Sequence, residues 1–158
     1  MAYETTRVSV EKSQSELRKL LRGYGADGYQ FGELTRSGDT YASIEFAHEG
    51  YVVRMRVPHK QPKLEDLKAR AKRARSKTLE DFYEEAQDQE ARRIWRVLYW
   101  NLKSRLEAVE EGVETFLEAF LSHVVNRVTG RTIYEELSET GRVELASPLP
   151  RLALEGGE

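Results

Sequence analysis

The first 57 residues contain two hydrophobic patterns, a helical one followed by an alternating one. Leucines spaced i, i+3 and i+4 follow the capping-box pair Ser13 and Glu16, which predicts a helix over residues 14–22. From residue 28 to 57, apolar and polar residues alternate in three runs that are separated by two polar, glycine-containing turns. This alternation predicts a three-stranded antiparallel meander.

The last of these runs predicts the chemistry of the two sheet faces. Val53, Met55 and Val57 alternate there with Arg54 and Arg56. Neighbouring side chains of a strand point to opposite faces of a sheet. We therefore expect one apolar face packed against the first helix and one face that displays Arg54 and Arg56.

The rest of the chain has helical patterns. A proline-containing linker at 58–63 is followed by a charged stretch at 64–77, which predicts either a short helix or a mobile connector. Thr78 and Asp81 then have the spacing of an N-cap, and apolar residues recur at spacings of three to five over 82–109, which predicts an amphipathic helix of up to about thirty residues. Two later cap-like pairs, Thr115 with Glu118 and Thr132 with Glu135, predict short helices at 116–122 and 133–137.

These elements predict an α+β fold in one domain: an N-terminal helix, a three-stranded antiparallel β-meander, one long amphipathic helix and short C-terminal helices. Residues 1–57 hold the helix and meander, and residues 58–77 form a basic connector. Residues 78–146 are a helical part that packs on the sheet or on a second subunit, and residues 147–158 are a flexible tail.

Composition narrows the class of protein. Of the 158 residues, 39% are hydrophobic and 33% are charged, which is enough apolar material for a core and excludes wholesale disorder. The sequence contains neither a membrane-spanning apolar run nor the pattern of a signal peptide, so we expect a soluble intracellular protein. The absence of cysteine excludes disulfides, thiolate metal sites and cysteine nucleophiles.

Charge is distributed unevenly behind a formal net charge of −2. Residues 1–57 hold 8 Lys/Arg and 8 Asp/Glu, residues 58–77 hold 8 and 2, and residues 78–158 hold 9 and 17. A strongly basic connector therefore precedes an acidic C-terminal half. Such a connector is compatible with phosphate binding, with a solvated helix face that the Glu-rich helix neutralises, or with a protein partner.

We favour phosphate binding, because cations gathered on one surface can neutralise several phosphates. Tyr51 is expected to stack on a base if it faces the same surface. The predicted phosphate-contacting residues are Arg54, Arg56, Lys68, Arg70, Lys72, Arg73 and Arg75.

Motifs of catalysis or cofactor binding give no candidate. Residues 23–28 match the dinucleotide-binding spacing G-x-G-x-x-G, but they follow a predicted helix and precede a predicted strand, the reverse of the order that the motif requires. The three histidines have no partner at metal-ligand spacing, and the glutamates at 107, 111 and 114 are interpreted as a solvated stripe. We therefore predict no enzymatic activity, no cofactor and no metal.

Aromatic residues cluster on the predicted long helix. Trp95 lies on the apolar stripe, whereas Tyr99 and Trp100 point partly elsewhere. We expect Trp95, Tyr99, Trp100 and Leu102 to form an interface in a homo-oligomer. Base stacking by Trp100 is a second interpretation, because Arg96 and Lys103 lie on its own helical face.

Three segments carry a resemblance to a known family: VSVEKSQSELRKLLRGYGADGYQFG, IEFAHEGYVVRMRVP, and ARRIWRVLYWNLKSRLEAVEEGVETFLEAFLSHVV followed by GRTIYEEL. Together they span residues 8–137 and resemble a family of small uncharacterised proteins encoded by bacteriophages and prophages. The resemblance implies a phage or prophage product in a bacterial cytoplasm, and it carries no catalytic residues.

The order of helix, three strands and basic-flanked helix is also similar to that of double-stranded-RNA-binding domains, where lysines at the last helix contact phosphates. The stretch KARAK at 68–72 comes near the lysine motif of those domains without matching it. From these features we predict a non-enzymatic protein that binds nucleic acid, DNA rather than RNA, and supports phage replication or recombination. The alternative is an interaction module whose acidic helical half binds a host or phage protein.

Overall fold

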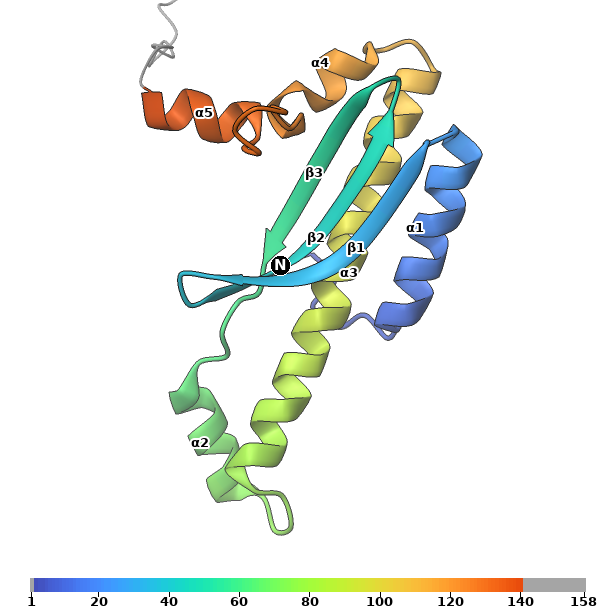
Figure 1. Cartoon of the computed structure of the whole chain (residues 1–158). Helices are drawn as coiled ribbons and strands as arrows, with labels where there is room; N and C mark the ends of the chain where they lie inside the picture. The colour runs from blue at the N-terminus through green and yellow to red at the C-terminus, as the bar shows by residue number, and fades with distance from the viewer. Residues whose placement is uncertain (1, 141–158) are drawn as a thin grey trace, which may run out of the picture.

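The protein is a three-stranded sheet with two helices on one face, as the α+β prediction states (Figure 1). The computed structural model describes residues 2–140, so the tail predicted at 147–158 lies outside the described residues. Strands β1 (Gly28–Arg36), β2 (Asp39–His48) and β3 (Tyr51–Pro58) are antiparallel in the order β1-β2-β3. Helices α1 (Val10–Tyr24) and α3 (Leu79–Glu110) lie side by side behind this sheet.

Two-residue turns fix the register of the sheet. Ser37 and Gly38 have φ values of 54° and 87°, and Glu49 and Gly50 have φ values of 49° and 81°. Positive φ values at both central positions are typical of the tight two-residue hairpin turn, whose backbone twist matches that of the flanking strands. The turns set Arg36 opposite Asp39 and His48 opposite Tyr51, and every other pair follows from these.

The core lies between the sheet and the two helices. Ile44, Phe46 and Val53 point from the strands toward Trp95 and Leu98 of α3, and all five are at most 1% exposed. Neither α1 nor α3 packs on the other face of the sheet, and this open sheet face displays residues 30, 34, 36, 41, 43, 45, 54 and 56 among others. The predicted division into an apolar face and an arginine-bearing face is confirmed.

Helix α1 begins earlier than the sequence pattern predicts. Ser9 is the N-cap, and its hydroxyl accepts from the Lys12 amide at 3.1 Å. Ser13, the predicted cap, lies fully buried inside the helix and accepts a hydrogen bond from Arg96 of α3 at 3.3 Å. The prediction of Ser13 as the N-cap was wrong, because the sequence around Ser9 and the sequence around Ser13 both suit a helix start. Ser13 takes a different role only because Arg96 of the neighbouring helix donates to its hydroxyl.

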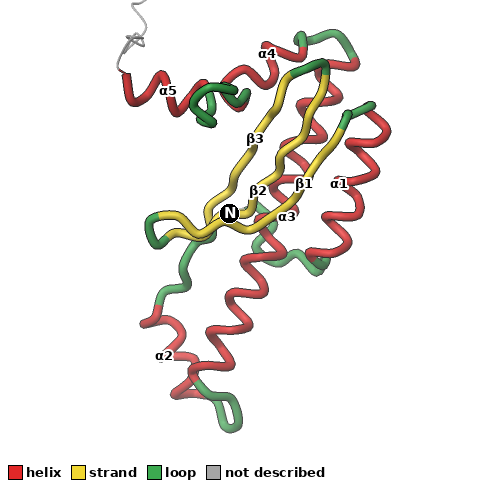
Figure 2. Tube along the Cα trace, viewed as in Figure 1, coloured by secondary structure: helices red, strands yellow, loops and turns green. Residues whose placement is uncertain are grey.

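Helix α3 has 32 residues and extends beyond the sheet (Figure 2). It begins at a capping box in which Thr78 and Asp81 exchange hydrogen bonds, as the sequence pattern predicts. Helix α2 (Leu64–Arg73) packs against its first turns through Leu67, which is 3% exposed. The charged stretch after the linker is therefore a docked helix.

The C-terminal elements close one end of the core and cover one edge of the sheet. Helix α4 (Phe116–Phe120) begins at the predicted Thr115 cap, and Phe116 and Phe120 meet the Phe46 ring edge-on. A 3₁₀ turn (Leu121–His123) and helix α5 (Ile133–Thr140) follow. Between them, Val124 bridges to Val53, whereas the outer edge of β1 has no strand partner among the described residues.

Candidate nucleic-acid interface

The basic connector folds into helix α2, whose ends suit the helix dipole. Glu65 and Asp66 occupy its first turn, and three of the cations predicted to bind nucleic acid occupy its last turn. The linker before α2 is held against α3, because the Lys60 amide donates to the Glu90 carboxylate at 2.8 Å. The α2 cations are therefore displayed from a fixed position at the end of the molecule opposite the β2–β3 turn (Figure 1).

Between residues 64 and 77, four cations are exposed and form no ion pair or hydrogen bond through their side chains among residues 2–140: Lys68, Lys72, Arg73 and Arg75. Lys68 and Lys72 are one helical turn apart on the side of α2 away from Leu67. We call these four residues the α2 cation set. No acidic residue lies between Lys68 and Lys77 in the sequence, and the carboxylates of this segment, Glu65 and Asp66, are confined to the first turn of α2.

The other two cations between residues 64 and 77, Arg70 and Lys77, are engaged. The Arg70 guanidinium lies over the Phe82 ring at 4.9 Å, and Lys77 pairs with Glu85 of α3. Cation–π contact at the surface contributes about 0.5–1 kcal/mol, so Arg70 helps to dock α2 on α3. Of the predicted phosphate ligands on this segment, Arg70 is thus partly committed to the fold.

Arg54 and Arg56 lie on the open sheet face, as predicted, but on a different element from the α2 cation set. Arg54 donates to the Glu45 carboxylate at 2.9 and 3.1 Å and to the Gly130 carbonyl at 2.8 Å. Arg56 donates to Glu135 of α5 at 3.3 Å. Both arginines therefore connect structural elements, which the sequence analysis did not foresee.

Burial and neighbouring charges shift the pKa values of Glu45 and Arg56. Burial alone would raise the pKa of the Glu45 carboxyl, but hydrogen bonds from Gln30 and Arg54 and the nearby positive charges outweigh it and hold this pKa below its usual value. Burial lowers the pKa of Arg56, and repulsion by Arg54 and by Arg36 adds to this effect. The arginines of the open sheet face thus repel one another.

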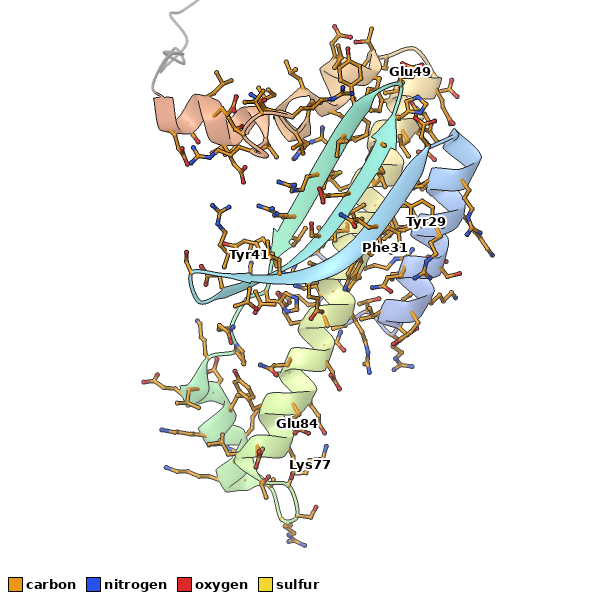
Figure 3. All side chains as sticks on the ribbon, in the orientation of Figure 1. Tyr29, Phe31, Tyr41, Glu49, Lys77 and Glu84 are labelled. Carbon is orange, nitrogen blue, oxygen red and sulfur yellow. The ribbon has the colours of Figure 1, made fainter. Side chains whose placement is uncertain are left out.

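Tyr51 does not share a surface with these arginines. It belongs to the β3 residues that face the helices, and its ring lies 6.2 Å from that of Phe116. Its neighbour Glu49 lies at one end of the molecule and Lys77 at the other (Figure 3). The condition for base stacking by Tyr51 beside the predicted phosphate ligands is not met.

The residues predicted at an oligomer interface divide into two groups. Trp95 and Leu102 are at most 1% exposed within the single chain, so their burial requires no second copy. Sequence reasoning placed them at an interface because the sheet that covers them lies far back in the chain. Tyr99 is half-buried and Trp100 is 42% exposed, with Arg96 and Lys103 within 6 Å of the Trp100 ring.

Two residues near Arg56 escaped the sequence analysis. Arg36 reaches the open sheet face, and Tyr134 of α5 lies across from it beside a shared hollow. The turn at 37–38 carries a usable signal, because a two-residue hairpin turn places residue 36 opposite 39 and fixes which face each side chain takes. Nothing in the sequence indicates that α5 returns to this face.

Other site classes find no support in the described part of the chain. Within residues 2–140, no three acidic or histidine side chains gather closely enough to hold a metal ion. Among the same residues, no helix has the length and apolar character that a bilayer crossing requires. Comparisons with protein-family models, with curated proteins and with solved structures find no match to this chain.

Proposed function

We propose that this protein binds nucleic acid without strong sequence specificity, through phosphates contacted by the α2 cation set. The observation that carries the proposal is that these four exposed cations have no partner in the described residues, whereas most arginines elsewhere are paired or stacked. Each phosphate that a cation neutralises releases condensed counterions, which supplies binding free energy.

The chemistry of the set favours backbone contact over base reading. Lysines act as mobile point charges, and phosphate contacts position a protein on nucleic acid without reading its sequence. The α2 cation set is also separate from the core, so its side chains can adapt to a strand without a cost in packing. We therefore expect similar affinity for different sequences of one strand type.

The test is fluorescence anisotropy of labelled single-stranded DNA, double-stranded DNA and double-stranded RNA over a salt series. Four phosphate contacts on duplex DNA give a slope of log K against log salt of about −3.6, at about −0.9 per contact. A fourfold increase in salt then weakens binding by about two orders of magnitude. The variant in which the α2 cation set is changed to alanine is expected to lose both the affinity and most of the slope.

A matched pair of variants controls for net charge. Lys68→Ala/Lys72→Ala and Lys12→Ala/Lys19→Ala each remove two exposed lysines from a helix surface, the first from α2 and the second from α1. The proposal predicts that the α2 pair weakens binding far more than the α1 pair. Equal losses from both pairs, or no binding at low salt to any of the three nucleic acids, would contradict it.

A protein-binding function is the second candidate, and one observation favours it. Glu80, Glu84 and Asp88 form an exposed stripe on α3, at intervals of four, without side-chain partners in residues 2–140. Glu84 lies near the α2 end of the helix (Figure 3). Such a stripe suits a basic partner. The test is cross-linking in bacterial lysate of the wild-type protein and of the Glu80→Gln/Glu84→Gln/Asp88→Asn variant. The protein-binding function predicts that a partner cross-links to the wild type and that this cross-link is lost in the variant.

The cellular role that we assign is support of phage DNA replication or recombination in the bacterial cytoplasm, and it rests on the sequence resemblance alone. We also retain the homo-oligomer as a proposal that now depends on Tyr99 and Trp100, since Trp95 and Leu102 are core residues. Light scattering of the wild type and of Trp100→Ala tests it, and a monomeric wild type at high concentration would contradict it.

A further inference from the structure

A hollow of about 440 Å³ lies between the open sheet face and the segment that carries α5. Arg36, Tyr41 and Arg56 contribute to its sheet wall, and Thr132, Tyr134 and Glu135 contribute to the opposite wall. Tyr41 stands near the end of the sheet where β1 turns into β2 (Figure 3). Small-molecule sites commonly have this size and combine apolar walls with a few converging polar groups.

The hollow has more positive than negative charge. Arg36, Arg54 and Arg56 outnumber the carboxylates Glu45 and Glu135 that face them. Arg54 is satisfied by Glu45 and by the Gly130 carbonyl. Glu135 divides its oxygens between Arg56 and the Thr132 amide at the start of α5, so it cannot neutralise the group alone.

Arg36 and Arg56 retain most of their N–H donors unused. The side chain of Arg36 forms no hydrogen bond or ion pair in the described residues. Arg56 uses one of its five N–H donors, on Glu135, and its Nε is shielded from solvent without any partner. Leaving a buried charged donor unsatisfied is costly. An anion beside Arg36 and Arg56 would both accept from them and reduce their mutual repulsion.

Besides the polar residues Ser37, His123 and Thr132, the remaining lining is apolar and aromatic. Leu34 and Tyr41 are direct cross-strand partners, and Tyr134 is 65% exposed on the other side of the hollow. Tyrosine rings are stacking surfaces for nucleobases and tolerate any base. A ligand that fits both features has an anionic group joined to a flat ring.

We propose that this hollow binds a single nucleotide, with its phosphate at Arg36 and Arg56 and its base against Tyr134 and the Leu34–Tyr41 pair. The site extends the proposed function to a second surface and does not depend on α2. Free nucleotides and the terminal or internal units of a single strand share this chemistry.

The experiment is a calorimetric and NMR titration of the full chain at low salt with thymidine monophosphate, thymidine, inorganic phosphate and a short single-stranded oligothymidylate. We expect thymidine monophosphate to bind more tightly than either thymidine or phosphate, because only it fills both halves of the hollow. Tighter binding of the oligothymidylate than of the monophosphate identifies a strand as the source of the nucleotide, and the reverse order identifies the free nucleotide.

Two variants test the halves separately. Arg36→Gln removes an exposed, unpaired cation, and Tyr134→Ala removes a mostly exposed ring, so neither is expected to disturb folding. Each should weaken thymidine monophosphate binding about tenfold, the usual scale for one charge-assisted hydrogen bond or one stacked base. Arg7→Gln, which also removes an exposed and unpaired arginine, should leave binding unchanged.

The outcomes separate this inference from the proposed function. Thymidine monophosphate that binds no better than phosphate, or that binds equally to Arg36→Gln and wild type, overturns the nucleotide site even if duplex DNA still binds through α2. Thymidine monophosphate that binds as predicted to the variant lacking the α2 cation set supports the site even if no nucleic acid binds to α2.

Discussion

Arg96 joins α3 to α1 across the core, and its replacement by methionine tests how much this contact stabilises the fold. Its Nη1 donates to the Glu16 carboxylate at 2.5 Å and to the Ser13 hydroxyl at 3.3 Å. The guanidinium also lies 4.2 Å from the centre of the Tyr99 ring. Methionine keeps the apolar stem in place while it removes the charge and the donors.

The expected loss follows from these contacts. A hydrogen bond to a charged group contributes about 1.5–3 kcal/mol, and the lower part of this range applies because the Glu16 side chain is 33% exposed and water can replace Arg96. The Ser13 hydroxyl is fully buried and loses a partner, and the contact with Tyr99 adds about 0.5–1 kcal/mol. Recovered solvation of the arginine offsets part of the sum. We expect Arg96→Met to lower the free energy of unfolding by about 2–3 kcal/mol.

Urea unfolding followed by circular dichroism measures this loss, and thermal unfolding should show a decrease in Tm of about 5–10 °C for a domain of this size. A double-mutant cycle with Glu16→Gln isolates the pair, with an expected coupling of about 1–2 kcal/mol. The control is Arg92→Met, one turn earlier on α3, where the side chain donates to its helical neighbour Gln89 at 3.4 Å and forms no other hydrogen bond or ion pair within residues 2–140. Its expected cost is below about 0.5 kcal/mol.

The reasoning would be refuted if Arg96→Met were no more destabilising than Arg92→Met. A coupling energy near zero in the double-mutant cycle would also refute it, because it would mean that water stabilises the Glu16 carboxylate as well as the Arg96 guanidinium does. A large loss with no coupling would assign the effect to Ser13 and Tyr99 instead.

Three further predictions concern the core, a turn and one titrating group. Phe46→Ala, which removes the ring that meets α4, should lower the free energy of unfolding by about 3–5 kcal/mol in a urea titration. Gly50→Ala, at a φ of 81°, should cost about 1–2 kcal/mol, whereas Gly23→Ala within α1, where a Cβ meets nothing within 4 Å, should stabilise by about 0.5–1 kcal/mol; equal effects of the two would contradict the turn argument. Burial and then the charge of Arg105 lower the pKa of His123, so the fold favours neutral imidazole. The stability that neutral His123 contributes is complete above the unfolded pKa of about 6.5 and is lost as the pH falls below that value. Urea midpoints of the wild type should therefore decline between about pH 6.5 and 5.5, a range in which lowered carboxyl pKa values have no effect. The variant His123→Gln should flatten this decline.

Local patterns predicted the elements whose cause is local. Alternation along β3 predicted that Arg54 and Arg56 lie on the open sheet face. Successive side chains of a strand point to opposite faces, so these arginines face away from the helices because Val53 and Met55 face toward them. The cap at Thr78 was likewise readable, since both partners of a capping box lie within four residues.

The features that could not be predicted depend on contacts between distant segments. Ser13 looks like a helix cap until Arg96, 83 residues later, supplies another partner. Trp95 looks like an interface residue until the sheet is placed over it. Glu135 reaches Arg56 only because α5 returns to the sheet, 79 residues further along the chain. The spacing of residues along the sequence does not indicate which distant segments come into contact.

The arrangement in which α3 covers a sheet that precedes it has a consequence for synthesis on the ribosome. The meander is complete at Pro58, but the core residues of α3 that cover it extend to Leu106. At a translation rate of about 5–20 residues per second, the apolar side of the meander waits a few seconds for its cover. During that interval α3 does not yet cover Ile44, Phe46 and Met55, and the free edge of β1 lies beside them. We therefore expect the nascent chain to be a substrate for chaperones at this stage, and truncation before Trp95 to leave a product prone to aggregate.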